Sequence, residues 1–368
     1  MEVDDIALTL TPGIGAKGAA HLLGRFGTAR GIFAASRDEL VEGAQLRDEL
    51  ARRLLKREAF PAAERELVYC RRNGLVPLAS TDGEYPALLR ETPDYPHVLY
   101  VLGNVAVLRR TMLTMVGTRR MTCYGQQMAE RLVGELAGRL PGTVVVSGLA
   151  FGVDAACHRA ALAFGLPTVG VVASVLPSIT PAQHAALARD MIERGGAVVS
   201  ELHSQSRQNG SFYLARNRIL AGMSGGTVVV ESPLGGGSMA TARMADGYDR
   251  TVMAVPGRAT DAMSAGVNAL IRDRKAQLVL SGEDVVREMM WDVTRSGELA
   301  VPAPEAAPEF TGPERRLLGC FAAAGETVAV ELLAERSGLA LGELSALLLG
   351  LEMAGVIRQL PGSRYMRL

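Results

Sequence analysis

The amino-acid sequence predicts an α/β protein built on a doubly wound, mostly parallel sheet of the extended Rossmann-like type. Short β-branched runs alternate with helix-length segments between residues 73 and 290, which is typical of a parallel sheet covered on both faces. Residues 1–72 carry apolar side chains at helical spacing, and residues 312–368 read as helices followed by a hairpin, the order of a winged helix. A stretch rich in Pro, Ala and Glu within residues 291–311 predicts a linker.

The helical first part, residues 1–72, contains a glycine turn at Leu10–Lys17. This turn resembles a helix-hairpin-helix of the kind found in SAM-like domains, whose backbone N–H groups can contact a DNA phosphate. A helical bundle that uses these glycines only to turn the chain is an equally good interpretation.

The middle part, residues 73–290, supplies the sheet. We expect strands at residues 113–117, 144–147, 168–173, 197–200, 227–230 and 252–255, and helices at 124–140, 154–164, 181–194 and 238–247. Ligands of such sheets bind at the carboxyl ends of the strands, so the turns that follow the strands are the candidate binding elements.

Composition limits the functions that this chain can have. The 368 residues include 39 basic and 39 acidic side chains, so the chain is not coated in positive charge, although a local basic groove is compatible with this balance. The cysteines Cys70, Cys123, Cys157 and Cys320 are far apart, so we expect small buried side chains in a reducing compartment, with no metal and no cofactor. The acidic start and the lack of a membrane-length apolar run predict a cytoplasmic protein.

The turns after the first two expected strands carry the first candidates. Gly117, Thr118 and Arg119 follow the first strand, where a dinucleotide site would need further glycines, so we expect no NAD site. Ser147 and Gly148 follow the second and could offer a hydroxyl and an N–H to phosphate. Asp154 suits a helix cap; a catalytic pair with His158 is less favoured because no nucleophile is evident beside it.

The densest group of candidates lies at two expected helix starts. Its members are Phe212, Tyr213, Arg216, Asn217 and Arg218 at the first, and Gly236, Gly237, Ser238 and Arg243 at the second. Helix starts and arginine forks suit phosphate, and aromatic faces stack on unpaired bases, so the sequence predicts single-stranded nucleic acid as the ligand. Phosphate contacts from these arginines and Arg119 would give a salt slope of roughly −3, at about −0.7 per phosphate, and Arg216→Ala would flatten it by about 0.7.

These motifs resemble those of the DprA/Smf family (DNA processing protein A). The resemblance rests on Val116-Gly117-Thr118-Arg119, Ser147-Gly148-Leu149-Ala150, Ala215-Arg216-Asn217-Arg218-Ile219, Gly237-Ser238 and Ala254-Val255-Pro256-Gly257. It implies a homodimer without catalysis that binds and protects incoming single-stranded DNA and loads the recombinase RecA during natural transformation. It also implies that Arg119, Ser147, Gly148, Arg216, Asn217, Arg218, Gly237 and Ser238 form the DNA pocket.

The sequence departs from the family pattern at several places. Phe151 stands where a lysine or arginine is common, Pro177 and Thr180 replace the usual polar and aromatic residues after the third strand, and Tyr213-Leu214 replaces a Phe-Pro pair. Losing a cation at Phe151 should lower affinity, and either Phe212 or Tyr213 could be the stacking aromatic. The dimer interface is not evident, although the apolar turns near Leu176 and Met239 are candidates.

Two alternatives belong to other classes. A nucleotide phosphoribohydrolase would use a carboxylate such as Glu201 or Glu231, but its glycine-loop carboxylate is missing here, where Thr241 follows Gly237-Ser238. A DNA-uptake scaffold would bind proteins through its end domains and DNA only weakly. The expected recognition helix of the winged part carries Glu343 and Glu352 and no basic residue, which favours protein docking or self-docking over duplex binding.

Overall fold

The computed structural model describes residues 1–207, 209–291, 310–321, 327–353, 356–360 and 362–367. The chain divides into two compact units, Met1–Val293 and Thr294–Leu368. Trp291 packs against the first unit and Phe310 against the second, so both described ends of the expected linker belong to folded units. The rest of that linker, residues 292–309, lies outside the described residues.

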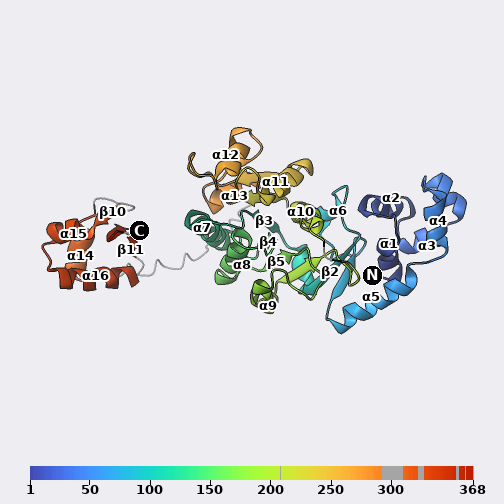
Figure 1. Ribbon diagram of the computed structural model, residues 1–368, viewed down its shortest axis with the longest axis horizontal. Coiled ribbons are helices and arrows are strands. Elements are labelled where there is room, and N and C mark those ends of the chain that lie inside the picture. The colour runs from blue at the N-terminus through green and yellow to red at the C-terminus, as the bar shows by residue number, and fades with distance from the viewer. Residues whose placement is uncertain (208, 292–309, 322–326, 354–355, 361, 368) are drawn as a thin grey trace, which may run out of the picture. The chain divides into compact units, whose positions relative to one another are not determined.

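The first unit begins with a helical segment, drawn in blue in Figure 1. Its elements are α1 (Val3–Leu10), α2 (Ala16–Phe26), α3 (Ala29–Ala34), η1 (Glu39–Gly43), α4 (Asp48–Leu55) and α5 (Phe60–Arg72). A turn containing Gly13, whose φ is +94°, joins α1 to α2, as both the helix-hairpin-helix and the plain helical bundle require. Helix α5 ends at Arg72, and Ile32 belongs to the same apolar cluster as Val172 and Met191 of the sheet part. The helical segment and the sheet therefore share one core.

A nine-stranded sheet runs through the first unit in the order β1-β2-β6-β5-β4-β3-β7-β8-β9. The strands are β1 (Val76–Ala79), β2 (Val98–Gly103), β3 (Met112–Val116), β4 (Val144–Ser147), β5 (Thr168–Val171), β6 (Ala197–Ser200), β7 (Gly226–Val229), β8 (Thr251–Ala254) and β9 (Gln277–Leu278). All neighbouring pairs from β6 to β9 are parallel, whereas β1 and β2 pair antiparallel. Every expected strand is present; β1, β2 and β9 are additional.

Helices cover both faces of the sheet, as Figure 1 shows. They are α6 (Ala87–Arg90), η2 (Val105–Arg109), α7 (Cys123–Arg139), α8 (Val153–Ala163), η3 (Ala182–His184), α9 (Ala185–Glu193), α10 (Ser211–Met223), α11 (Gly237–Gly247), α12 (Ala265–Arg272) and α13 (Gly282–Glu288). Side chains alternate along β3: Leu113 and Met115 pack in the cluster of α7, α8 and α13, while Met112 and Val116 pack in the cluster of α10, α11 and α12. The sheet is therefore doubly wound, as expected. The single helix expected at 181–194 is divided into η3 and α9.

The second unit has the order of a winged helix. It contains α14 (Gly312–Leu318), β10 (Thr327–Ala329), α15 (Val330–Ser337), α16 (Leu341–Met353), β11 (Ile357–Leu360) and β12 (Arg364–Arg367). Leu317, Leu333 and Leu348 of the three helices meet in one apolar cluster. The strands form an antiparallel sheet in the order β10-β12-β11, which gives the expected wing.

Two further expectations concern membranes and cysteines. None of the helices in the described ranges is long and apolar enough to span a membrane. Cys70 and Cys157 are buried, as expected, but Cys123 at the start of α7 is exposed and Cys320 is only half-buried. The expectation that all four are buried is therefore wrong for the last two.

Candidate nucleic-acid interface

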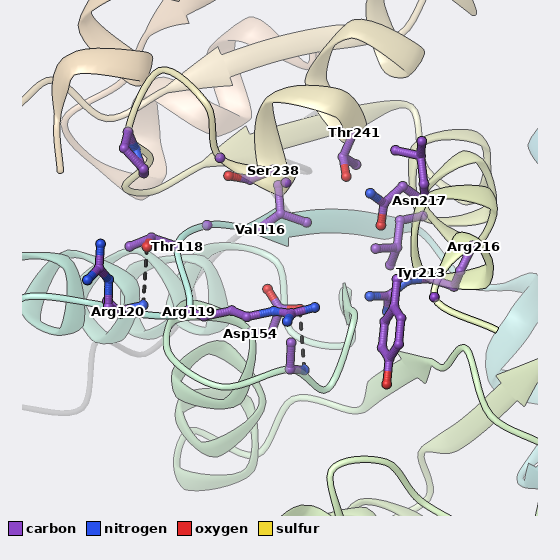
Figure 2. Close-up of a pocket in the computed structure, with 18 residues that line it drawn as sticks. Val116, Thr118, Arg119, Arg120, Asp154, Tyr213, Arg216, Asn217, Ser238 and Thr241 are labelled. Atoms are coloured by element: carbon purple, nitrogen blue, oxygen red, sulfur yellow. Dashed lines mark hydrogen bonds between the residues drawn. The ribbon is translucent and has the colours of Figure 1, made fainter. Parts of the chain in front are cut away.

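A cavity of about 470 Å³ opens at the carboxyl ends of the central strands. Strand β3 lies between β4 and β7 in the sheet, and the chain moves outward in opposite directions from it. Such a reversal of strand order leaves a crevice, because the connections on the two sides diverge. The cavity is lined by the turn after β3, the start of α8, α10 and the start of α11 (Figure 2).

Two exposed arginines, Arg119 and Arg120, line this cavity. The Arg119 guanidinium carbon lies 5.5 Å from the centre of the Tyr213 ring, and Figure 2 shows the side chain reaching across the cavity toward α10. Across the described part of the chain, neither guanidinium pairs with a carboxylate. Both cations are therefore available to a phosphate. Arg120 was not among the predicted site residues, although it directly follows Arg119.

Arg216 also lines the cavity, but its position differs from the prediction. Its side chain is 6% exposed, and one guanidinium nitrogen donates to the carbonyl oxygens of Gly148 and Val171. Burial lowers the pKa of Arg216 and nearby Asp154 opposes that change, yet arginine stays protonated at neutral pH. Arg216 braces the turn after β4, and the expectation that it neutralises a phosphate is not supported by this geometry.

Arg218 and Arg243 do not line the cavity. The Arg218 guanidinium lies 2.5 Å from Glu201 Oε2 in a largely buried ion pair, so this geometry does not support its predicted role as a phosphate contact. Arg243 is exposed on α11 but lies outside the cavity lining. Arg216 and Arg218, two of the arginines expected to bind phosphate, are thus engaged within the protein.

The predicted hydroxyl groups have partners inside the protein. Ser147 is fully buried and donates to the Met115 carbonyl at 2.6 Å. Contrary to the expectation, its hydroxyl is therefore not offered to a ligand. Ser238 donates to the Ser232 hydroxyl at 2.8 Å, and Thr118 accepts from the Arg120 backbone N–H at 3.1 Å. Thr118 and Ser238 still line the cavity, where they shape the turn after β3 and the start of α11.

The glycines divide into two groups. A Cβ on Gly117 would lie 2.5 Å from Val153 Cγ2, and a Cβ on Gly236 would collide with Ser232, so packing within the protein explains both. A Cβ on Gly148 would collide with Arg216. The Gly148 N–H donates to Asp154 Oδ2 at 3.1 Å, so, contrary to the expectation, it is not available to phosphate. A Cβ on Gly237, the first residue of α11, would meet nothing within 4 Å. Open space at Gly237 is compatible with close approach of a ligand.

Polar and aromatic groups of α10 and α11 complete the site. Tyr213 lines the cavity, whereas Phe212 does not, which favours Tyr213 as the stacking residue. Asn217 is 9% exposed, and its amide has no partner among the described residues. Figure 2 shows this amide directed into the cavity, with the Thr241 hydroxyl nearby. Thr241 was missed as a site residue, although it follows Gly237 by about one helical turn.

Asp154 and His158 do not form a catalytic pair. Asp154 Oδ2 accepts from the Gly148 and Ala150 N–H groups at 3.1 and 3.4 Å, and burial raises its pKa while Arg216 opposes the shift. The His158 ring is buried and contacts the Thr168 hydroxyl at 2.6 Å, and burial lowers its pKa to about 3. Asp154 therefore orders the turn after β4, as its expected structural role requires.

The carboxylates of the hydrolase alternative also have structural partners. Glu231 accepts from the Thr122 backbone N–H at 2.9 Å and from its hydroxyl at 2.6 Å, which fixes the start of α7. Glu201 pairs with Arg218. Neither lines the cavity.

The two residues that mark the apolar turns suggested as dimer contacts are themselves buried. Leu176 is 1% exposed and packs in the cluster of the amino-terminal helices, and Met239 of α11 is 6% exposed. Neither side chain presents an apolar surface of its own, so an interface there stays a prediction that involves their neighbours.

In the second unit, helix α16 carries Glu343 and Glu352 and no basic residue. In the wing, Arg358 and Arg364 are exposed, while Arg367 donates to the Leu318 carbonyl at 3.2 Å. The recognition-helix position thus has the wrong charge for a DNA phosphate backbone.

Known proteins are similar to this chain in sequence and in fold. A family model for DNA recombination-mediator protein A matches residues 77–290, and one for the DprA winged helix domain matches residues 301–363. Protein Smf of Escherichia coli (strain K12) is 35% identical over 298 residues, covering 79% of this chain and 77% of that protein. The DNA processing protein DprA of Streptococcus pneumoniae (strain R6) is 36% identical over 207 residues, covering 56% and 72%.

Two solved structures agree with these matches. DprA from Streptococcus pneumoniae superposes with a TM-score of 0.67 at 27% identity, covering 78% of this chain and 98% of that one. DNA processing protein A from Helicobacter pylori, whose structure concerns its single-stranded DNA binding mode, gives a TM-score of 0.51 at 27% identity, covering 59% and 95%. The chain therefore belongs to the DNA recombination-mediator protein A (DprA) family.

Proposed function

We propose that this protein is a non-enzymatic, cytoplasmic mediator that binds single-stranded DNA at the cavity beside β3, protects it and delivers it to the recombinase RecA. The observation that carries the binding part is the cavity itself. It combines two unpaired exposed arginines, an aromatic ring and an open helix start at the reversal point of the sheet. The family membership and the single-stranded DNA binding mode described for the Helicobacter pylori protein support the same ligand.

The observed positions of the arginines reduce the expected number of phosphate contacts and therefore the expected salt dependence of DNA binding. Arg216 and Arg218 are engaged within the protein, which leaves Arg119 and Arg120 as the cavity's available cations among the described residues. At about −0.7 per phosphate contact on a single strand, two contacts give a salt slope of roughly −1.4. Arg243 would steepen the slope only if the strand extends along α11.

Binding is tested with the full-length protein and a fluorescent oligothymidylate at several salt concentrations. We expect binding at low ionic strength with a slope of roughly −1.4. Equal affinity for a duplex of the same length, or no binding at low salt, would contradict the proposal.

Delivery to a recombinase rests on the family description rather than on any residue of the cavity. Strands coated by this protein should support RecA filament formation sooner than strands coated by a single-strand binding protein alone, and should resist nuclease digestion. A filament rate unaffected by this protein would remove the mediator role while leaving DNA binding intact.

Dimerisation and the absence of catalysis are also proposals. Light scattering measures the first. The second is tested by incubation with nucleoside monophosphates, from which a phosphoribohydrolase would release free base. A DNA-uptake scaffold would instead show weak oligonucleotide binding that the Arg119→Ala change does not alter.

A further inference from the structure

An exposed aromatic ring, Phe151, lies in the turn after β4 beside the cavity. Its side chain is 45% exposed. Its chain neighbour Ala150 and nearby Asp154 both line the cavity. An exposed aromatic face beside a cavity that offers cations to phosphate is the arrangement on which unpaired bases stack.

The backbone of this turn is packed against the turn that carries Arg119. Val153 N–H donates to the Thr118 carbonyl at 3.2 Å, and a Cβ on Gly152 would lie 2.8 Å from the Arg119 carbonyl carbon. Gly152 has a φ of +76°, which brings the two turns into direct contact. Phe151 therefore belongs to a turn that is in direct backbone contact with the turn carrying the available cation Arg119.

The Phe151 ring packs against the ring of His184. Its centroid lies 4.9 Å from that of the His184 ring at an interplanar angle of 63°, an edge-to-face contact. His184 is 4% exposed, and its Nδ1 lies 2.8 Å from the Leu149 carbonyl oxygen, which fixes the supporting ring. Phe151 is thus a positioned ring with much of its surface open to solvent.

We propose that Phe151 is a second stacking surface, which receives an unpaired base next to the nucleotide held at the cavity. This inference rests on the proposed single-stranded DNA function. The strand would run from the Tyr213 side of the cavity, past Arg119, to the turn after β4. A base stacked on Phe151 contributes affinity without neutralising a phosphate, so it strengthens binding without steepening the salt dependence. The residue thus replaces the cation expected at this place with a salt-independent contact.

Phe164 supplies a matched control. It is 51% exposed and stands at the other end of helix α8, at the C-cap, where it packs against Gly134. Phe151→Ala and Phe164→Ala therefore remove the same side chain from opposite ends of one helix.

The test measures oligothymidylate affinity of the full-length protein carrying Phe151→Ala, Phe151→Tyr or Phe164→Ala, each verified by its melting temperature. We expect Phe151→Ala to weaken binding by about fivefold to 150-fold with an unchanged salt slope, and the other two variants to bind like the wild type. Phe151→Lys should steepen the slope by about 0.7. On a strand in which abasic residues replace the bases, the wild type and Phe151→Ala should bind equally.

Two results would overturn this inference alone: wild-type affinity in Phe151→Ala, or a loss of the same size on the abasic strand. The first would leave protein docking as the use of the ring, and the second would assign it to the shape of the turn. Failure of the wild type to bind any strand would instead overturn the proposed function and this inference together.

Discussion

The Arg119 guanidinium lies over the face of Tyr213, 5.5 Å from its ring centre, and so connects the turn after β3 to helix α10 across the cavity. A cation at this distance is attracted by the ring, and the contact contributes about 0.5–1 kcal/mol at an exposed site. A base that stacks on the covered face of Tyr213 must displace Arg119, which is then available to the adjoining phosphate. In the proposed function, the pair would therefore link base stacking to phosphate binding.

Replacing Arg119 should change the salt dependence of DNA binding. Arg119→Ala removes one phosphate contact, so the slope should flatten by about 0.7, while Arg119→Lys should keep the slope. The measurement is fluorescence anisotropy of an oligothymidylate over a salt series. An unchanged slope in Arg119→Ala would exclude Arg119 from the contacts.

Replacing Arg216 should affect folding rather than the salt slope. Arg216→Ala leaves the buried Asp154 without its cation and the carbonyls of Gly148 and Val171 without their donor. Removing one partner of a buried charged group costs about 3–5 kcal/mol, so the free energy of unfolding should fall by that order. Urea unfolding, followed by the fluorescence of Trp291, the sole tryptophan, measures it. A stable variant whose slope is flattened by 0.7 would show instead that Arg216 contacts phosphate.

Two glycines should respond differently to the same change. Gly237→Ala adds a Cβ in open space at the start of α11, so the melting temperature should hold while DNA affinity falls. Gly117→Ala places a Cβ 2.5 Å from Val153, and such overpacking costs about 1–3 kcal/mol of stability. Unchanged affinity in Gly237→Ala would mean that no ligand approaches the start of α11.

Stability should fall in acid because His158 is buried. Burial lowers its pKa from 6.5 to about 3, so between these values the unfolded chain binds a proton that the folded chain does not. The stabilising contribution is therefore complete above pH 6.5 and is lost as pH falls toward 3, by up to roughly 1.4 kcal/mol per pH unit. Urea unfolding of His158→Gln should show a shallower pH dependence than the wild type, with the exposed His21→Gln as control. Identical pH profiles for His158→Gln and the wild type would contradict this assignment.

The parallel sheet was predictable because its strands are short β-branched runs separated by helix-length segments. Strand β1 was not, because Pro77 interrupts its pattern, and β9 is too short to produce one. The shared core of the helical segment and the sheet was also hidden, since Ile32 and Met191 are brought together only by the fold.

The location of the cavity at the strand ends was predictable from the sequence, but the direction of each side chain was not. Arg216 and Arg218 are two residues apart on α10, so they project about 200° apart around the helix axis. Arg216 therefore points into the protein beneath the cavity, whereas Arg218 pairs with Glu201, which directly follows β6. The sequence pattern contains both arginines but not their partners, which belong to distant segments. Arg120 was overlooked although it lies in the same turn as Arg119.

Cross-linking locates the DNA most directly. The full-length protein is irradiated with an oligonucleotide containing 4-thiothymidine, and the modified peptides are identified by mass spectrometry. We expect cross-links to the peptides containing Arg119 and Tyr213, on either side of the cavity. Cross-links confined to the Leu10–Lys17 turn or to the winged helix, with none at the cavity, would contradict single-strand binding beside β3.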